Sequence, residues 1–190
     1  MSNNIKQILG ELRQDHRNMT LLLNMIEQES NHIYEGGDSD FEVIRDVMHY
    51  MTVYPDAVHH PKEDRLYAEL KAVRPDLSAG FDRITLDHRS ISESGLRLRD
   101  ELGAVGAGSF VRRKSLVADA LRYVNSLRSH MQWEELDLFR RCEEMTATGH
   151  VMIIDSNLVN TSDPVFGEKR DSEFKRLLKS IEQSLTASRA

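Results

Sequence analysis

Apolar residues recur at spacings of three and four along four long stretches of this 190-residue chain. Residues three and four apart lie on the same face of an α-helix, so each stretch should form a helix with one apolar side. The first stripe contains Ile5, Leu9, Leu12, Met19, Leu23 and Ile26, with His16 in the middle. The Gly-Gly pair at residues 36 and 37 should end this helix.

The second stripe is interrupted by two prolines. The helix should begin after Ser39 or Asp40, since either residue can cap it. Pro55 and Pro61 each remove an amide hydrogen, and they should bend the helix or locally unwind it. The stripe keeps its phase across both prolines, which favours one kinked helix over two short ones. Its members are Phe41, Ile44, Met48, Met51, His59, Glu63, Leu66 and Leu70.

Two further stripes complete the set. The third contains Phe81, Ile84, His88, Ile91, Gly95, Leu98 and Leu102. The fourth belongs to a helix expected from about Phe110 to about Glu144, and it contains Val117, Ala120, Val124, Leu127, Met131, Glu134 and Leu138, with His130 beside it. Long amphipathic helices with short connections predict an all-α fold, most simply an up-down-up-down four-helix bundle.

The C-terminal part of the chain differs in pattern. Residues 149–167 show no helical periodicity, whereas a short apolar face follows, made of Phe174, Leu177, Leu178, Ile181 and Leu185. We therefore divide the chain into a bundle domain, residues 1–148, and a C-terminal extension with a short amphipathic helix, residues 149–190. That helix should either cover one end of the bundle or join two copies of the chain in a homodimer.

Composition limits the classes of function. The formal net charge is −6, and no basic stripe or aromatic ladder indicates binding to nucleic acid. The longest apolar runs are too short to span a bilayer, and the first residues lack the pattern of a signal peptide. Cys142 is the only cysteine, so no intramolecular disulfide can form. These features predict a cytoplasmic protein with no nucleic-acid partner and no membrane partner.

Each predicted helix places a histidine on its apolar face or at the edge of that face, namely His16, His59, His88 and His130. Glu63 and Glu134 each follow a histidine by one helical turn, so each His-x-x-x-Glu pair can point at one centre. Unpaired carboxylates in an apolar core are costly, and a bound cation removes that cost. Six nitrogen and oxygen donors exceed the needs of one tetrahedral zinc and suit two metal ions bridged by the glutamates.

Each piece of this pattern has an ordinary explanation when it stands alone. A single histidine on an apolar stripe is more often a hydrogen-bonded core residue, and a single His-x-x-x-Glu pair is more often a surface pair. His60 and Asp64 repeat the spacing one position out of phase, and we rank them second because His59 and Glu63 fit the inward stripe better. Structural zinc, or no metal, is the alternative reading of the layer.

Other chemistry-bearing residues carry weaker signals. Glu29 and His32 have a ferritin-like spacing, but that pattern needs the motif on two helices. Cys142 should be a small buried residue, because no Cys-His nucleophile arrangement accompanies it. Packing roles are expected for Trp133, Tyr50 and Tyr54, and surface or supporting positions for His32, His49 and His150. We assign no catalytic residue.

The motifs "HHPKED" and "HMQWEE", preceded by His16 and separated by His88, resemble the hemerythrin-like HHE cation-binding domain. The resemblance extends from about residue 5 to residue 147 and implies a four-helix bundle around a non-haem di-iron centre. An oxo or hydroxo group and the two glutamates would bridge the two iron ions, and zinc or manganese fits less well. The implied metal ligands are His16, His59, Glu63, His88, His130 and Glu134.

The chain departs from the oxygen-carrying members of that family. Those proteins place a second histidine in the third helix, where this chain has Ser92, and they end on His-x-x-x-x-Asp, where it has His130-x-x-x-Glu134. One iron should therefore have an additional open position. The resemblance implies a protein that binds or reacts with a small oxidant, namely dioxygen, nitric oxide or peroxide. The alternative is an iron, oxygen or redox sensor, or an interaction module, whose bundle the metal stabilises.

Overall fold

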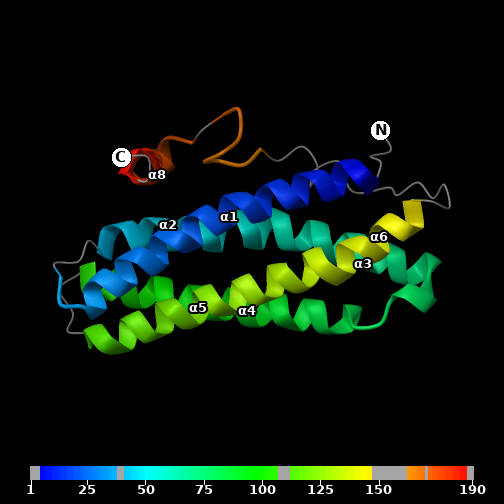
Figure 1. Ribbon diagram of the computed structural model, residues 1–190, viewed down its shortest axis with the longest axis horizontal. Helices are drawn as coiled ribbons and strands as arrows, with labels where there is room; N and C mark the ends of the chain where they lie inside the picture. Colours follow the sequence, from blue (N-terminus) through cyan, green and yellow to red (C-terminus); the bar gives the residue numbers. More distant parts are fainter. Residues whose placement is uncertain (1–4, 38–40, 107–111, 147–161, 170, 188–190) are drawn as a thin grey trace.

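The computed structural model describes residues 5–37, 41–106, 112–146, 162–169 and 171–187. These ranges contain helices and turns and no strand, so the all-α prediction is confirmed for them. The long helices lie lengthwise beside one another, as they do in a bundle (Figure 1). None of the helices within these ranges is long and apolar enough to cross a membrane. The up-down-up-down order and the domain boundary at residue 148 stay predictions.

Helix α1 (Ile5–Tyr34) is uninterrupted, and its apolar stripe is buried from end to end. The Gly-Gly pair ends it as expected. Gly36 has a φ of 90°, a conformation that is open to glycine and costly for residues with a Cβ atom. The amides of Gly36 and Gly37 donate to the carbonyls of Ile33 and His32, which satisfies two of the last free carbonyls of the helix.

The second helix is continuous, but it changes type at the first proline. It consists of α2 (Phe41–Tyr54), the π-helical turn η1 (Pro55–His59) and α3 (His60–Val73). Pro55 has no amide hydrogen to donate, and the amide of His60 donates to its carbonyl, five residues back. One continuous helix, locally unwound at Pro55, is therefore confirmed over two short ones, and its irregular turn ends on His59.

The 3-10 turn η2 (Pro75–Leu77) precedes α4 (Phe81–Gly106). The fourth long helix consists of α5 (Arg113–Trp133), a second π-helical turn η3 (Glu134–Leu138) and α6 (Phe139–Thr146). The predicted start near Phe110 falls on residues outside the described ranges. No proline or glycine marks η3 in the sequence, so this turn was not predicted. Turns of this type are common at functional sites, and η1 and η3 each border a His-x-x-x-Glu motif.

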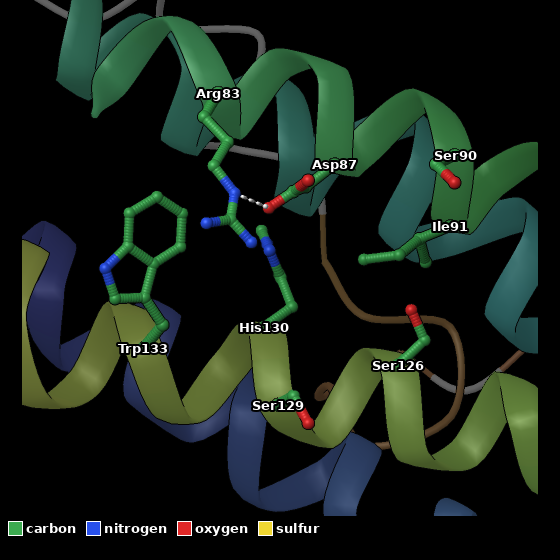
Figure 2. A pocket seen from close by; sticks show the side chains of 8 residues that line it. All are labelled: Arg83, Asp87, Ser90, Ile91, Ser126, Ser129, His130 and Trp133. Atoms are coloured by element: carbon green, nitrogen blue, oxygen red, sulfur yellow. Dashed lines mark hydrogen bonds and ion pairs between the residues drawn. The ribbon is translucent and has the colours of Figure 1, made fainter.

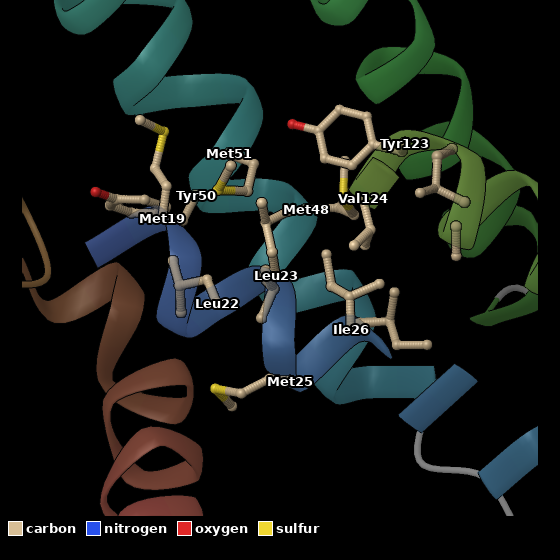
Figure 3. Close-up of a cluster of buried hydrophobic side chains, with 14 of the residues drawn as sticks. Met19, Leu22, Leu23, Met25, Ile26, Met48, Tyr50, Met51, Tyr123 and Val124 are labelled. Carbon is tan, nitrogen blue, oxygen red and sulfur yellow. The ribbon is translucent and has the colours of Figure 1, made fainter. Parts of the chain in front are cut away.

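Two apolar clusters form the core, and a polar layer lies between them. The larger cluster, part of which is drawn in Figure 3, includes Met19, Leu23, Met48, Tyr123 and Val124. The smaller cluster includes Leu12, Leu66, Phe81, Leu138 and Phe139. His16, His59 and His88 each fall between the two clusters along their helices, as His16 does between Leu12 and Met19. Apolar packing on both sides keeps bulk water out of the layer, which strengthens the electrostatic interactions inside it.

The C-terminal extension packs against the bundle of its own chain. Its described parts are residues 162–169, the 3-10 turn η4 (Ser172–Phe174) and α8 (Lys175–Ala187). Phe174, Leu177 and Ile181 are buried in the larger cluster, whereas Leu185 is 42% exposed. The irregular segment predicted for residues 149–167 lies largely outside the described ranges. Pairing of two copies through this helix stays a prediction.

Asp163 anchors the extension to the bundle. Its Oδ1 accepts hydrogen bonds from the amides of Val165 and Phe166 at 2.8 and 2.9 Å. Its Oδ2 accepts one from the Tyr50 hydroxyl at 2.8 Å and one from the Asn18 amide group at 3.4 Å. Because this carboxylate is buried and accepts on both oxygens, it ties the extension to α1 and α2 at one point.

Candidate metal centre

The polar layer brings together all six residues that the spacing selects. They come from α1, from the η1–α3 junction, from α4 and from the α5–η3 junction, and all six are buried. Their donor atoms form two overlapping groups in which each atom lies within 4.8 Å of the others. One group contains His16, His59 and Glu63, and the other contains Glu63, His88, His130 and Glu134.

Glu63 stands between two sets of imidazoles. Its Oε1 lies 3.4 Å from Nε2 of His16 and 3.2 Å from Nε2 of His59. Its Oε2 lies 3.4 Å from Nε2 of His88, on the other side. This carboxylate therefore turns one oxygen to each set of imidazoles.

Glu134, the first residue of η3, also meets both sets. Its Oε2 lies 3.3 Å from Nε2 of His130 and 3.5 Å from Nε2 of His16, and its Oε1 lies 3.9 Å from Nε2 of His88. The hydroxyl of Tyr67 donates a hydrogen bond to Oε1 at 3.1 Å. Tyr67 therefore holds the orientation of this carboxylate, a role that the sequence analysis did not predict.

Most of the buried polar atoms without a partner are in this layer. Among the described residues, the buried side-chain nitrogen and oxygen atoms that lack a hydrogen bond belong to these imidazoles and carboxylates and to His60, apart from Oγ of Ser30. An unpaired buried polar atom costs about 1–3 kcal/mol, so such a cluster is unfavourable unless something binds there. Two ligands about 2.1 Å from one ion are roughly 3.0–3.4 Å apart, close to the separations found here. The residues therefore fit a metal ion.

Carboxylates hold the outer nitrogens of three of the imidazoles. A neutral imidazole that donates Nδ1–H outward offers its Nε2 lone pair inward, which is the form that binds a metal. The outer partners all come from other helices, which is why the sequence analysis did not find them. The pairs are His16 with Glu135 at 3.0 Å, His59 with Asp15 at 3.1 Å and His88 with Asp64 at 3.1 Å. Nδ1 of His130 has no hydrogen-bond partner within the described part of the chain.

The second-ranked pair, His60 and Asp64, does not form. Asp64 instead accepts a hydrogen bond from His88. His60 directs Nδ1 to Asp56, one turn before it, at 3.2 Å. Neither residue belongs to the groups of donor atoms that could hold an ion. This arrangement favours the pair that follows the inward stripe.

Imidazoles and carboxylates of the layer stabilise each other's charges. Burial opposes a charge on Glu63, yet the positive charge of His59 and the close approach of the surrounding imidazoles lower its pKa well below the ordinary value. Burial also opposes a charge on His88, but hydrogen bonds to the surrounding carboxylates raise its pKa to about 11. The pKa of His16 is raised well above its ordinary value in the same way. A bound cation would take the place of these protons.

Two cavities reach the layer on different sides of α5. The cavity between α4 and α5 has a volume of about 260 Å³ and is lined by Arg83, Asp87, Ser90, Ile91, Ser126, Ser129, His130 and Trp133 (Figure 2). The cavity between α1 and the α5–η3 junction measures about 440 Å³, and its walls include His16, Thr20, Met131, Glu135 and Leu136. Each cavity has a candidate ligand in its wall, so a small molecule can approach the layer from either side.

The remaining candidates lie apart from the layer. Cys142 is fully buried and unpaired, and burial raises the pKa of its thiol to about 12, as suits a packing residue. His32 is exposed at the end of α1, and His49 pairs with Glu173 of the extension at 2.8 Å. Tyr50 contacts Asp163 rather than the layer. His150 lies outside the described residues.

Comparison with known proteins gives one finding. Residues 7–142 match the model of a protein family described as the hemerythrin HHE cation binding domain. No curated protein and no solved structure matches the chain. The matched range includes every residue of the candidate metal layer and both motifs that carried the resemblance. The chain therefore belongs to the hemerythrin HHE cation-binding domain family.

Proposed function

We propose that the polar layer holds two iron ions and that the protein uses them to bind or reduce a small oxidant, namely dioxygen, nitric oxide or peroxide. The position of Glu63 carries this proposal, because its two oxygens face different sets of imidazoles. His16 and His59 would serve one ion, and His88 and His130 the other. Glu63 and Glu134 would serve both, within a bundle whose helices run up-down-up-down.

The donor set supports iron as the metal. Each ion would have two imidazoles and a share of two carboxylates, a mixture that suits iron and leaves positions open on a six-coordinate ion. Iron would supply the change of oxidation state and a place for the small ligand. Membership of the cation-binding family supports a metal in general, and the identity and number of the ions rest on this donor chemistry.

The rest of the chain prepares the layer for that chemistry. Asp15, Asp64 and Glu135 hold three imidazoles in the orientation that points Nε2 inward. The two apolar clusters exclude bulk water from above and below the layer. Ile91 and Met131 each line one of the two cavities, so they limit the size of the molecules that reach the layer.

A metal analysis tests the proposal. The purified chain, loaded with ferrous iron under argon, should contain about two irons and, once oxidised, show near-ultraviolet absorption bands that bleach on reduction. His59→Ala and Glu63→Ala should lose most of the iron, whereas His60→Ala and the surface variant His32→Ala should retain it. A chain that takes up no iron under these conditions, or one in which the His60 variant loses more than the His59 variant, would contradict the ligand assignment.

A second candidate function, a sensor module, is favoured by one set of contacts. Asp15 holds His59, and Asp163 anchors the C-terminal extension. The Tyr54 ring stacks on that of Tyr50, with centroids 5.8 Å apart, and Tyr50 donates to Asp163. Burial and the nearby charge of Asp15 raise the pKa of Tyr54. A change at the metal layer therefore has a route to the extension. If Asp163→Ala abolishes assembly or partner binding and leaves iron content and oxidant kinetics intact, the sensor function is the better description.

A further inference from the structure

His60 is a fifth imidazole beside the layer, and the six-ligand site gives it no role. It is the first residue of α3 and is 5% exposed. Its ring stacks on that of His88, with centroids 4.3 Å apart and planes inclined by 17°. Edge contacts join it to His59 and His130, at centroid distances of 5.6 and 6.4 Å. Rings of three candidate ligands therefore surround it.

The two nitrogens of His60 face different surroundings. Nδ1 lies 3.2 Å from Oδ1 of Asp56, and Oδ2 of Asp56 accepts a hydrogen bond from the Ser92 hydroxyl at 2.7 Å. Because a carboxylate oxygen lies against Nδ1, the neutral ring carries its hydrogen on Nδ1 and a lone pair on Nε2. Nε2 is buried and has no hydrogen-bond partner among the residues that the structure describes. A lone pair in this position requires a cation or a hydrogen-bond donor.

The described side chains supply neither. His60 does not belong to the groups of donor atoms that could share an ion. Nε2 of His59, of His88 and of His130 each lies near a carboxylate oxygen of the layer. Nδ1 of His130 makes no hydrogen bond to His60, so none of these rings supplies a donor. The partner of Nε2 is therefore not one of the described side chains, and a small molecule that enters the layer can supply it.

We propose that Nε2 of His60 accepts a hydrogen bond from a small ligand that carries an O–H group and occupies the open position of the metal layer. His60 thereby selects the class of ligand. Water and hydroperoxide carry an O–H group, whereas dioxygen, nitric oxide and azide do not. This inference rests on the proposed di-iron function and narrows it, since it favours peroxide among the three oxidants. Asp56 and Ser92 act as positioning residues that hold the ring.

Azide titration of the iron-loaded full chain tests the inference. His60→Phe removes the acceptor and keeps a flat ring, and His60→Gln restores an oxygen acceptor. Azide has to displace the water that His60 holds, so azide should bind His60→Phe roughly five- to tenfold more tightly than the unmodified chain. His60→Gln should stay within about threefold of the unmodified chain. Hydrogen peroxide consumption should fall by about fivefold or more in His60→Phe.

Metal content and a matched control separate the outcomes. His32→Phe makes the same change at an exposed histidine of α1 and should alter none of these quantities. His60→Leu provides a second side chain without an acceptor if the phenylalanine variant does not fold. Unchanged or weaker azide binding with full iron content would overturn the role of His60, and so would a loss of iron as large as that of His59→Phe. If the unmodified chain binds no iron, the proposed function fails and this inference falls with it.

Discussion

Replacement of Glu63 by glutamine tests the centre of the candidate site with the smallest change in shape. The Glu63 side chain is fully buried, and its oxygens lie 3.2–3.4 Å from three imidazole nitrogens. Glutamine keeps the volume but loses the charge and one of the two acceptor oxygens, so it cannot bridge two cations. We expect iron content to fall from about two ions per chain to near zero.

The same prediction can be tested by the difference in Tm between the metal-bound and the metal-free chain. A metal ion at 100 times its Kd stabilises the folded state by about 2.7 kcal/mol. In a chain of this size, 1 kcal/mol corresponds to a change in Tm of about 2–4 °C. Two such sites should therefore raise the Tm of the unmodified chain by roughly 11–22 °C. In Glu63→Gln the metal-dependent rise should be less than about 3 °C.

The assay compares Tm with ferrous iron under argon and with a chelator, by circular dichroism. Glu69→Gln is the matched control, because Glu69 is also on α3 and pairs with Arg65 at 2.6 Å away from the layer. The control should show the full metal-dependent rise. A Glu63→Gln variant that keeps both its iron and its rise in Tm would refute the bridging role.

Three further predictions concern the surroundings of the layer. Metal uptake near pH 7 should release protons, because the raised pKa values of His16 and His88 keep these imidazoles protonated in the metal-free chain. Metal affinity should therefore rise with pH. Calorimetry in buffers of different ionisation enthalpy measures the protons exchanged, and proton uptake on metal binding would contradict the prediction. Asp64→Ala removes the acceptor at Nδ1 of His88 and should weaken metal binding about 10–100-fold in chelator competition, whereas the exposed variant Asp82→Ala should not. Asp163→Ala leaves the buried Tyr50 hydroxyl without its acceptor and should lower Tm by roughly 2–12 °C at unchanged iron content. The control Asp171→Ala removes one hydrogen bond from a backbone amide at an exposed position, and it should lower Tm by less.

Helical periodicity is enough to select the residues of the layer. On α1 and α4 the inward stripe passes straight through the layer, so His16 and His88 occupy positions where a regular core would have an apolar residue. On the second helix the phase of the stripe chooses His59 over His60, and the separate surroundings of the two rings agree with that choice. Burial of these positions follows directly from the spacing of three and four.

The supporting contacts could not be predicted in this way, because they depend on how each helix is rotated about its axis. Asp15 precedes His16 in the chain, yet it bonds to His59 on another helix. Asp64 lies one turn after His60, yet it bonds to His88 on α4. Asp163 is even more remote, since its partner Tyr50 is 113 residues away in the chain. Rotation and docking of this kind are properties of the packed molecule, and a single helix pattern does not contain them.

The number of residues in the π-helical turn η3 determines which side chains of the following helix face the core. In a π turn each amide donates five residues back, so the turn contains one residue more than a regular turn. The helix beyond it is therefore rotated by about 100° relative to a regular continuation. This rotation brings Phe139 and Cys142 into the smaller cluster and lays the Phe139 ring parallel to His16 at 5.4 Å. Deletion of one residue from Glu134–Leu138 would restore α-helical bonding and turn both side chains away from the core, while His130, which precedes the turn, would keep its place.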